Sequence, residues 1–364
     1  MRTELDIVIL GLSITSSWGN GHATTYRALI RELDRMGMRV HFLERDTAWY
    51  AASRDLPTPP FCRTSLYASL EELRDVHAEA VRDADVVIVG SYVPDGVELS
   101  RWVLERARGL RAFYDIDTPV TLAKLARRDF EYLHPSLIPR FDLYLSFTGG
   151  ETLATLEQTH GSPCARALYC SVDPEHYAPR ADVATRWDLG YLGTYSDDRQ
   201  VRVESLLCEP ARSLPDQRFV VAGSRYPAQL RWPKNVERIE HLPPPEHSSF
   251  YNAQRFALNV TRDDMIQAGY SPSVRLFEAA ACGVPIISDI WPGIETILTP
   301  NEELLLVRSG AEVGELLASL REDQRRAIGQ RARARVLSAH TCAHRARQLL
   351  GYCREAAAIK GRAR

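Results

Sequence analysis

The stretch SPSVRLFEAAACGVPIISD, which begins at Ser271, constrains the fold of this chain more than any other. Ser271 suits a helix N-cap and Pro272 suits the first helical position. Gly283 suits the left-handed residue that ends a helix, so the pattern predicts one helix over residues 272–282. The apolar run at 284–288 follows at once and is typical of a strand covered on both faces of a parallel sheet. The stretch therefore predicts an α/β fold.

The same stretch predicts where a ligand binds. Ligands of parallel sheets lie beyond the carboxyl ends of the strands, where the next helix presents its N-terminus. The first N–H groups of a helix are unpaired and its dipole is positive there, which favours an anion near Ser273 and Val274. Glu278 lies further along, between Phe277 and a run of alanines, and a carboxylate there needs a partner. Two partners stay open from the residue alone: the vicinal hydroxyls of a ribose, or an arginine or helix cap within the protein.

Length and composition bound the class of protein. A chain of 364 residues with 45% hydrophobic and 25% charged residues fits two soluble domains of ordinary size. The net charge of -2 gives no global field that favours nucleic acid or an anionic membrane. The seven cysteines form no CxxC motif, and the apolar run near the N-terminus is too short to span a bilayer, so we expect a reduced, cytoplasmic protein without a transmembrane segment.

Charge is uneven near the C-terminus. Residues 321–364 hold twelve Arg or Lys against the acids Glu322, Asp323 and Glu355. This excess is typical of a solvated helix face; the alternative is peripheral contact with an anionic membrane or an acidic partner.

Apolar strand patterns alternate with helical ones along two segments of the chain. We expect an N-terminal Rossmann-like domain at 1–170, an interdomain linker at 171–187, a second Rossmann-like domain at 188–335 and a basic helical segment at 336–364. The final helix is long enough to cross back over the first domain, with a break near 338–341. The expected strands are 6–11, 40–44, 85–90, 110–115 and 141–147 in the first domain, and 188–193, 218–223, 236–242, 256–260 and 284–288 in the second, with a long loop at 50–68.

The loop after the first strand carries glycines without the dinucleotide fingerprint. Gly19, Asn20, Gly21 and His22 do not form GxGxxG. Glu44, at the end of the second strand, is the one acid in the place of a ribose ligand, so a dinucleotide oxidoreductase ranks last among the functions that we consider.

Four stretches, in order, resemble the group 1 type nucleotide-sugar glycosyltransferases of GT-B architecture, and most closely the spore-maturation-protein-like branch. They are WGNGHATTYRAL in the first loop, LYCSVDPEHYAP at 168–179, LGYLGTYSDDR at 189–199 and PSVRLFEAAACGVPIISD. The resemblance implies two Rossmann-like domains facing a cleft, with a nucleotide diphosphate sugar in the second domain and a small-molecule, glycan or protein acceptor in the first. It implies no cofactor and no metal.

The resemblance also assigns roles to residues. Glu278 would hold the ribose hydroxyls, and the backbone at Ser273 and Val274 would meet the diphosphate or the sugar. The loop of Gly193, Thr194 and Tyr195 would contact the donor, and Gly19, Asn20 and Gly21 would contact acceptor or phosphate. Many relatives carry a glutamate eight residues before Glu278 that touches the transferred sugar. This chain has Tyr270 there, so the identity of the sugar and the retaining mechanism do not follow directly.

Transfer from a nucleotide diphosphate requires stabilising the negative charge of the leaving group. The candidate cations are Arg199, Arg262 and Arg275, because a guanidinium binds phosphate through two parallel bonds. Asp115 and Asp117 resemble a metal-binding DxD, but they follow a first-domain strand, so we expect Asp117 to contact a sugar hydroxyl instead. His22 is the candidate general base if transfer inverts the anomeric centre.

We therefore expect a cytoplasmic, metal-independent and retaining glycosyltransferase that does not bind nucleic acid. A nucleotide-sugar epimerase of the same fold and a non-catalytic nucleotide or sugar binder are the alternatives.

Overall fold

Contacts divide the chain into two compact units, which are described separately. The computed structural model describes residues 4–18 and 21–362. Unit 1 comprises Met1–Cys170 and Cys342–Arg364, and unit 2 comprises Ser171–Thr341. The segment 171–187 is thus grouped with unit 2.

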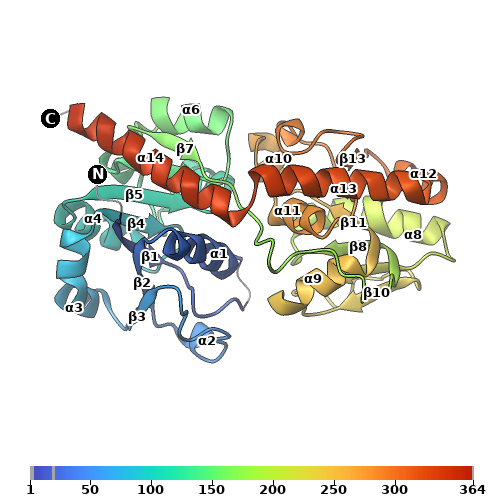
Figure 1. Ribbon diagram of the computed structural model, residues 1–364, viewed down its shortest axis with the longest axis horizontal. Coiled ribbons are helices and arrows are strands. Elements are labelled where there is room, and N and C mark those ends of the chain that lie inside the picture. The colour runs from blue at the N-terminus through green and yellow to red at the C-terminus, as the bar shows by residue number, and fades with distance from the viewer. Residues whose placement is uncertain (1–3, 19–20, 363–364) are drawn as a thin grey trace. The chain divides into compact units, whose positions relative to one another are not determined.

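Unit 1 is built on a seven-stranded sheet in the order β3-β2-β1-β4-β5-β6-β7 (Figure 1). Every neighbouring pair in it is parallel. The strands are β1 Asp6–Gly11, β2 Arg39–Arg45, β3 Arg63–Tyr67, β4 Val86–Gly90, β5 Leu110–Asp115, β6 Leu143–Ser146 and β7 Ala165–Ala167, and the helices are α1 His22–Arg35, α2 Ala48–Ala51, α3 Leu70–Asp83, α4 Gly96–Arg106, α5 Thr118–Ala126, the 3₁₀ helix Pro135–Arg140, α6 Glu151–Gln158 and α14 Cys342–Arg362.

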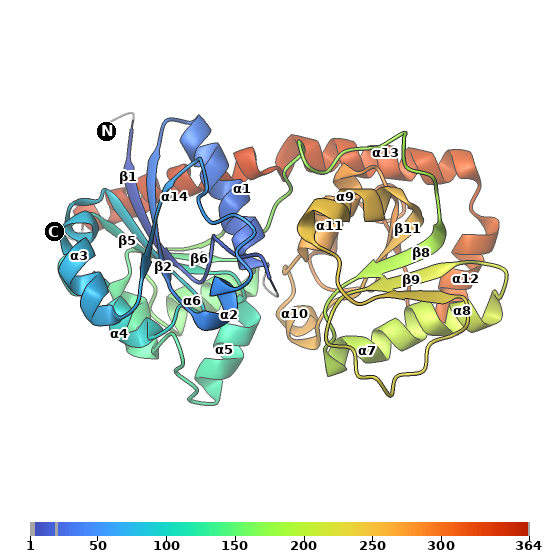
Figure 2. The same ribbon diagram turned by 90° about the horizontal axis from the view of Figure 1, so that it is seen from below.

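Alternation of side chains along the strands gives this sheet two buried faces. In β1, Ile7 and Ile9 belong to the core under α1 and α14, whereas Val8 and Leu10 belong to the core under α3 and α4. Successive residues of a strand point to opposite faces, so a continuous apolar run is the expected sequence of a doubly covered strand. Figure 2 shows α1 and α14 together on one side of the sheet.

The C-terminal helix packs in unit 1, as the sequence predicts. Leu349 and Cys353 of α14 lie in the same apolar core as Leu29 of α1. The Lys360 ammonium donates to Asp142 Oδ2 at 2.9 Å and to the Gly109 carbonyl at 2.8 Å.

Unit 2 has a six-stranded parallel sheet in the order β10-β9-β8-β11-β12-β13. The strands are β8 Trp187–Leu192, β9 Phe219–Ala222, β10 Val236–Ile239, β11 Gln254–Asn259, β12 Ile286–Ser288 and β13 Leu305–Leu306, and the helices are α7 Asp197–Val203, the π-helix Glu204–Cys208, α8 Glu209–Ser213, α9 Pro244–Asn252, α10 Asp263–Ala268, α11 Val274–Ala281, the 3₁₀ helix Ile294–Thr296, α12 Gly310–Ser319 and α13 Glu322–Ala339. Parallel α/β sheets in both units confirm the predicted fold class.

The crossover from β9 to β10 contains no helix, and stacked side chains take its place. The Arg238 guanidinium lies 4.1 Å from the ring centroid of Tyr226 and 4.8 Å from that of Trp232. It also donates to the carbonyls of Val221 and Gly223 at the end of β9. The guanidinium thus contacts two aromatic rings and two backbone carbonyls, which stabilises this crossover.

The expected loop at 50–68 is wrong in part, because β3 and the end of α2 lie within it. The edge strands β3, β7 and β13 were all missed. Arg63 and Leu66 of β3 are exposed, so this edge strand lacks the apolar run that marks the central strands. The break near 338–341 is confirmed, since α13 ends at Ala339 and α14 begins at Cys342.

Two glycines let α13 approach the end of α11. Gly283 has φ of +73°, the left-handed conformation expected of a helix stop. A Cβ on Gly329 of α13 would overlap the carbonyl group of Gly283. Arg333 donates from Nε to the Ala281 carbonyl at 3.1 Å, which satisfies a carbonyl at the end of α11.

Gly329→Ala should destabilise the protein, because the new methyl group has no room. Overpacking of this kind costs about 1–3 kcal/mol. Gly314→Ala is the matched control: it is also a helical glycine, but its Cβ would meet only Leu214 at 3.9 Å. We expect the control to be neutral or to gain up to about 1 kcal/mol in helix propensity. Urea unfolding followed by circular dichroism tests this, and equal midpoints for both variants would contradict the close packing.

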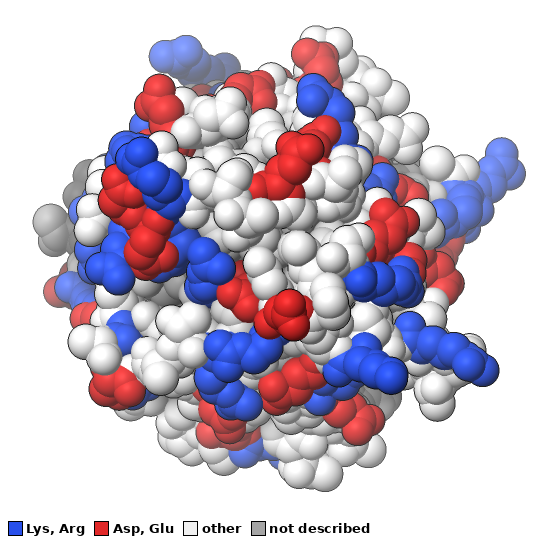
Figure 3. Space-filling model, turned by 90° about the vertical axis from the view of Figure 1, so that its right-hand side faces the viewer, with Lys and Arg blue, Asp and Glu red and all other residues white. Residues whose placement is uncertain are grey.

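Some of the basic side chains near the C-terminus make hydrogen bonds within the protein. Arg325, Arg331 and Arg333 of α13 each donate to a backbone carbonyl of unit 2. On the face shown in Figure 3, basic and acidic side chains are interspersed. Among residues 4–18 and 21–362, no helix is long and apolar enough to cross a membrane.

Candidate functional site

The carboxyl edge of the unit 2 sheet gathers most of the residues predicted to bind a donor. Gly193 follows β8, Arg262 follows β11, and Ser273 precedes α11. Because neighbouring strands are parallel, their carboxyl ends open at one edge. The structure therefore brings together segments up to 80 positions apart in the sequence.

The start of α11 differs from the prediction. The helix begins at Val274 with Ser273 as its N-cap, not at Pro272 with Ser271 as the cap. The Ser273 hydroxyl does not cap the helix but donates to Asn259 Oδ1 at 2.8 Å. This bond draws Ser273 toward β11, so the helix starts two residues late and its first turn has no side-chain cap. Such a start favours an anion.

The loop after β8 is closely packed and carries a fixed cation. A Cβ at Gly193 would lie 2.5 Å from the Tyr191 hydroxyl and 3.0 Å from Arg275 Nη2, so only glycine fits. Arg199 folds back over this loop, with Nε donating to Ser196 Oγ at 2.9 Å and Nη2 to the Thr194 carbonyl at 2.6 Å. The Tyr195 N–H donates to the Ser224 carbonyl. The Arg199 charge is thus positioned at the loop expected to hold phosphate.

Arg275 lies within the sheet edge. It is 8% exposed, and it donates from Nε to the Leu192 carbonyl at 2.5 Å and from Nη1 to Asn259 Oδ1 at 2.9 Å. Its guanidinium lies 4.8 Å from the ring centroid of Tyr191. Arg275 therefore ties β8 and β11 to α11, and only its Nη2 side lies beside the Gly193 loop.

Arg262 lies in a chain of ion pairs that joins the β11 loop to α7. Its Nε is 3.8 Å from Asp198 Oδ2, which also accepts the Asp263 N–H at 3.0 Å. Arg202 of α7 lies 2.5 Å from Asp263 Oδ1 and 3.8 Å from Asp289 Oδ2. These contacts fix the two loops relative to each other within unit 2.

Glu278 is buried, and each of its carboxylate oxygens accepts a hydrogen bond from a tyrosine. Tyr177 donates to Oε1 at 2.8 Å and Tyr251 donates to Oε2 at 2.9 Å. Burial, together with the charge of Glu278, raises the pKa of both phenols well above the ordinary value, so both remain donors at neutral pH. A carboxylate oxygen has two lone pairs, so each oxygen retains one for a further donor. The partners within the protein are thus two phenols, and neither an arginine nor a helix cap, the alternative considered from the sequence, binds this carboxylate in the described residues.

Tyr251→Phe removes the hydrogen bond to Glu278 Oε2. It should lower the free energy of unfolding by about 1.5–3 kcal/mol, the usual contribution of a hydrogen bond to a charged group. Tyr191→Phe is the matched control, because the Tyr191 hydroxyl is buried with no hydrogen-bond partner among the described residues, and its loss should be neutral or stabilising. Denaturant unfolding of both variants, of Glu278→Gln, and of Tyr251→Phe combined with Glu278→Gln measures the coupling between the two side chains. A Tyr251→Phe effect no larger than that of the control would contradict the carboxylate clamp.

Tyr270 occupies a strained position. Its φ of +46° is uncommon outside glycine and costs of order 1–3 kcal/mol. Its N–H donates to the Pro292 carbonyl at 2.6 Å, and its ring packs against Gly293, where a Cβ would lie 2.5 Å from the ring. The backbone before α11 is therefore held by the loop that follows β12.

Sequence reasoning missed Asn259, Thr261 and Asp289, which carry the polar contacts of this edge. Asn259 Nδ2 donates to Ser288 Oγ at 2.9 Å. Asp289 accepts from the N–H and the hydroxyl of Thr261, both at 2.8 Å, and burial raises its pKa. A polar residue that ends an apolar strand, as in FALN and IISD, is the signal that would have identified them.

Unit 1 places two predicted residues near each other at the carboxyl edge of its own sheet. His22 begins α1 and meets the Tyr92 ring at 5.4 Å between centroids, and Tyr92 donates to Asp117 Oδ2 at 3.2 Å. His22 Nδ1 is buried with no hydrogen-bond partner among the described residues. Gly21 is the N-cap of α1, whereas Gly19 and Asn20 lie outside the described residues.

Asp115 is buried and bound by side chains of its own unit. Tyr144 donates to Oδ2 at 2.6 Å and Thr121 donates to Oδ1 at 2.8 Å. Burial raises the pKa of Asp115 to about 6. Among residues 4–18 and 21–362, no group of three His, Cys, Asp or Glu side chains is arranged to hold a metal ion.

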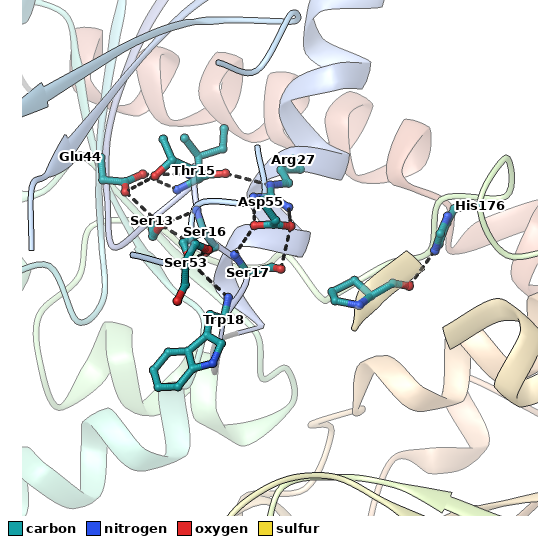
Figure 4. A network of polar contacts seen from close by, with 12 residues as sticks. Ser13, Thr15, Ser16, Ser17, Trp18, Arg27, Glu44, Ser53, Asp55 and His176 are labelled. Carbon is teal, nitrogen blue, oxygen red and sulfur yellow. Dashed lines mark hydrogen bonds and ion pairs between the residues drawn. The ribbon is translucent and has the colours of Figure 1, made fainter. Parts of the chain in front are cut away.

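Glu44 anchors the loop after β1, so the interpretation of this residue as a ribose ligand fails. Its Oε2 accepts the N–H groups of Ile14 at 2.6 Å and Thr15 at 3.0 Å, and its Oε1 accepts the hydroxyls of Thr15 at 2.6 Å and Ser13 at 3.1 Å (Figure 4). Four donors satisfy a fully buried carboxylate.

A cavity of about 590 Å³ lies at the opposite edge of the unit 1 sheet. Its lining includes Asp6, Val40 and Arg63, at the amino ends of β1, β2 and β3. None of the predicted site residues lines it.

The His22 ring should remain neutral at pH 6, because burial lowers its pKa from 6.5 to about 4. Between these values the unfolded chain binds a proton that the folded chain does not, so the free energy of unfolding decreases as pH falls through this window. Titration of the ring by NMR should give a midpoint near 4, and His22→Asn should flatten the pH dependence of stability. A midpoint near 6.5 would contradict the buried setting.

Comparisons with known proteins found a matching family model and solved structures of similar fold. Residues 199–351 match the model of the family described as glycosyl transferase-like, which covers α11 and the loop of Arg262. No match to the sequence was found among curated proteins.

Solved structures share the fold over nearly the whole chain. Sucrose-phosphate synthase from Thermosynechococcus elongatus has a TM-score of 0.73 at 15% identity, over 97% of this chain and 99% of the other. The Anabaena protein HepE, solved with UDP-glucose, has a TM-score of 0.68 at 13% identity, over 94% and 98%. A glycosyltransferase from Rickettsia africae has a TM-score of 0.67 at 11% identity, over 96% and 98%. The chain therefore has the GT-B fold.

Proposed function

We propose that the protein is a glycosyltransferase that binds a nucleotide diphosphate sugar at the carboxyl edge of the unit 2 sheet. The observation that carries the proposal is the clamped Glu278 carboxylate, which lies in the same unit as the uncapped start of α11 and the Arg199 loop. The family match over 199–351 and the UDP-glucose bound to HepE support it.

The chemistry divides among three groups. The two free lone pairs of Glu278 accept the ribose hydroxyls, and the first turn of α11 meets the diphosphate. Arg199 faces the charge that develops on the leaving group, which fixed dipoles and cations stabilise without reorganisation. Because the first turn of α11 and Arg199 supply the positive potential, the reaction needs no metal and no cofactor besides the donor.

Unit 1 holds the acceptor in this proposal, at the edge that carries His22 and Asp117. With retention, the donor phosphate guides attack on the same face of the sugar. With inversion, His22 is the base, since its neutral ring accepts a proton. We expect retention, and NMR of the anomeric product decides between the two outcomes.

We also place the protein in the spore-maturation-protein-like branch and in the cytoplasm. The stretch LYCSVDPEHYAP resembles the segment at the domain junction of the wider glycosyltransferase family, and Tyr177 of this stretch donates to Glu278.

A non-catalytic nucleotide or sugar binder is the second candidate, because Tyr270 replaces an acid that touches the transferred sugar in relatives. Its strained backbone favours a role at the site rather than loss of one. A nucleotide-sugar epimerase remains the same-fold alternative, and donor incubated without acceptor separates it from a transferase.

Calorimetry with UDP, GDP, TDP and ADP tests the donor site. We expect one of them to bind, and Glu278→Gln to weaken it roughly 10- to 100-fold, the loss of one hydrogen bond to a charged group. Glu295→Gln, on an exposed residue of the same unit, is the control and should bind normally. Binding of NAD but of no nucleoside diphosphate would contradict the proposal.

Measuring kcat tests the role proposed for Arg199. Arg199→Ala should lose roughly 100-fold in kcat, whereas Arg218→Ala, at the other end of the sheet, should lose nothing. A loss of less than about threefold would dismiss Arg199. The same assay in excess EDTA should retain activity, and activity that vanishes and returns with magnesium would contradict the metal-independent mechanism.

A further inference from the structure

Two indole side chains of unit 1 are half-exposed. Trp18 is 51% exposed and Trp49 is 59% exposed. Trp18 follows β1 and Trp49 follows β2, and these strands pair in parallel with Gly11 beside Glu44. Both side chains therefore come from segments that leave the same carboxyl edge of the sheet.

Hydrogen bonds join the two segments into one scaffold. The Ser16 hydroxyl donates to the Ser53 carbonyl at 2.7 Å, and the Ser17 N–H and hydroxyl donate to the Asp55 carboxylate at 2.8 and 2.9 Å. The Trp18 N–H donates to Ser16 Oγ at 3.3 Å. Figure 4 shows the indole of Trp18 pointing away from this network.

Side chains of β2 and α1 hold this scaffold in place. Glu44 holds the backbone at 14–15 through the bonds described above. Arg27 of α1 binds both oxygens of Asp55 at 2.8 and 2.9 Å and donates from Nε to the Ile14 carbonyl at 2.8 Å. A rigid aromatic surface loses little conformational entropy when a ligand binds.

The charges of this scaffold are paired among themselves. Arg27 pairs with Asp55, and Arg54 pairs with Asp46 at 2.6 Å. Glu44 is fully buried among its donors. A polyanion or an anionic membrane gains little from such a surface, because both are recruited by unpaired basic charge.

A saccharide is a suitable ligand for exposed indoles on a surface whose charges are paired. One face of a pyranose ring presents C–H groups, which pack against an indole, and its rim presents hydroxyls, which need acceptors. Indole is the side chain suited to a contact that is apolar on one side and wet on the other. Asp46 lies between β2 and Trp49, is half-exposed, and bonds Arg54 through Oδ1. Its Oδ2 supplies an acceptor for a hydroxyl.

We propose that Trp18 and Trp49 form an aromatic platform that binds a neutral saccharide. On the function proposed above, that saccharide is the acceptor. Binding to the platform itself does not depend on that function.

Titration of the full chain with maltohexaose, cellohexaose, chitohexaose and xylohexaose, followed by tryptophan fluorescence and calorimetry, tests the platform. At least one oligosaccharide should bind. Trp18→Ala and Trp49→Ala should each weaken that binding at least roughly tenfold, as expected for one lost aromatic contact. Trp49→Tyr should stay within about threefold, because it keeps an aromatic face. Val76→Ala, on a residue of α3 that is 64% exposed, is the control and should bind like the parent.

The platform is overturned if no oligosaccharide binds, or if the alanine variants bind as tightly as the parent. Sedimentation with phosphatidylcholine–phosphatidylglycerol vesicles that requires both tryptophans would also overturn it, in favour of a membrane contact. The affinity for the nucleoside diphosphate that binds the parent, measured on the same variants, should not change. If none of UDP, GDP, TDP and ADP binds the parent, the donor site is contradicted instead, while saccharide binding that needs Trp18 and Trp49 would still support the platform.

Discussion

The donor edge of unit 2 depends on how the carboxylate of Glu278 is satisfied. An ionised group in the protein interior is unstable unless it is paired and hydrogen-bonded. Tyr177 belongs to the segment that begins unit 2, Tyr251 belongs to α9, and Glu278 belongs to α11, so two hydrogen bonds fix three segments. The glycine contact between α13 and the end of α11 supports the same helix from its other end. The residue expected to recognise the ligand is therefore also the residue that organises its surroundings.

The central strands were predictable because they are buried on both faces and read as apolar runs. β1 and β5 begin and end at the predicted residues. Edge strands such as β3 have one side open to solvent, so they lack this signal. The start of α11 was misplaced because the Ser273 hydroxyl binds Asn259 rather than the helix, and a hydrogen bond between residues 14 positions apart is not visible in a capping pattern.

Partners of charged side chains were the least predictable part of the site. The sequence identifies Glu278 as a carboxylate that needs donors, but its donors lie 101 and 27 positions away. The sequence also left the donors of Glu44 open, because loop N–H groups and ribose hydroxyls can both donate to a carboxylate. In the structure the donors are groups of the loop after β1. Arg275 was expected to bind phosphate, but its Nε and Nη1 donate to the Leu192 carbonyl and to Asn259 at the sheet edge. Spacing along the chain indicates which residues need a partner, and only the fold determines which partner they meet.

Amide hydrogen exchange of the full chain, with and without the nucleoside diphosphate that binds, tests the central claim most directly because it locates the ligand without requiring turnover. At a ligand concentration near the Kd of the parent, we expect slower exchange in the loop 193–196 and in the first turn of α11, and loss of most of this protection in Glu278→Gln. Protection confined to unit 1, or equal protection in the Glu278→Gln variant, would contradict it.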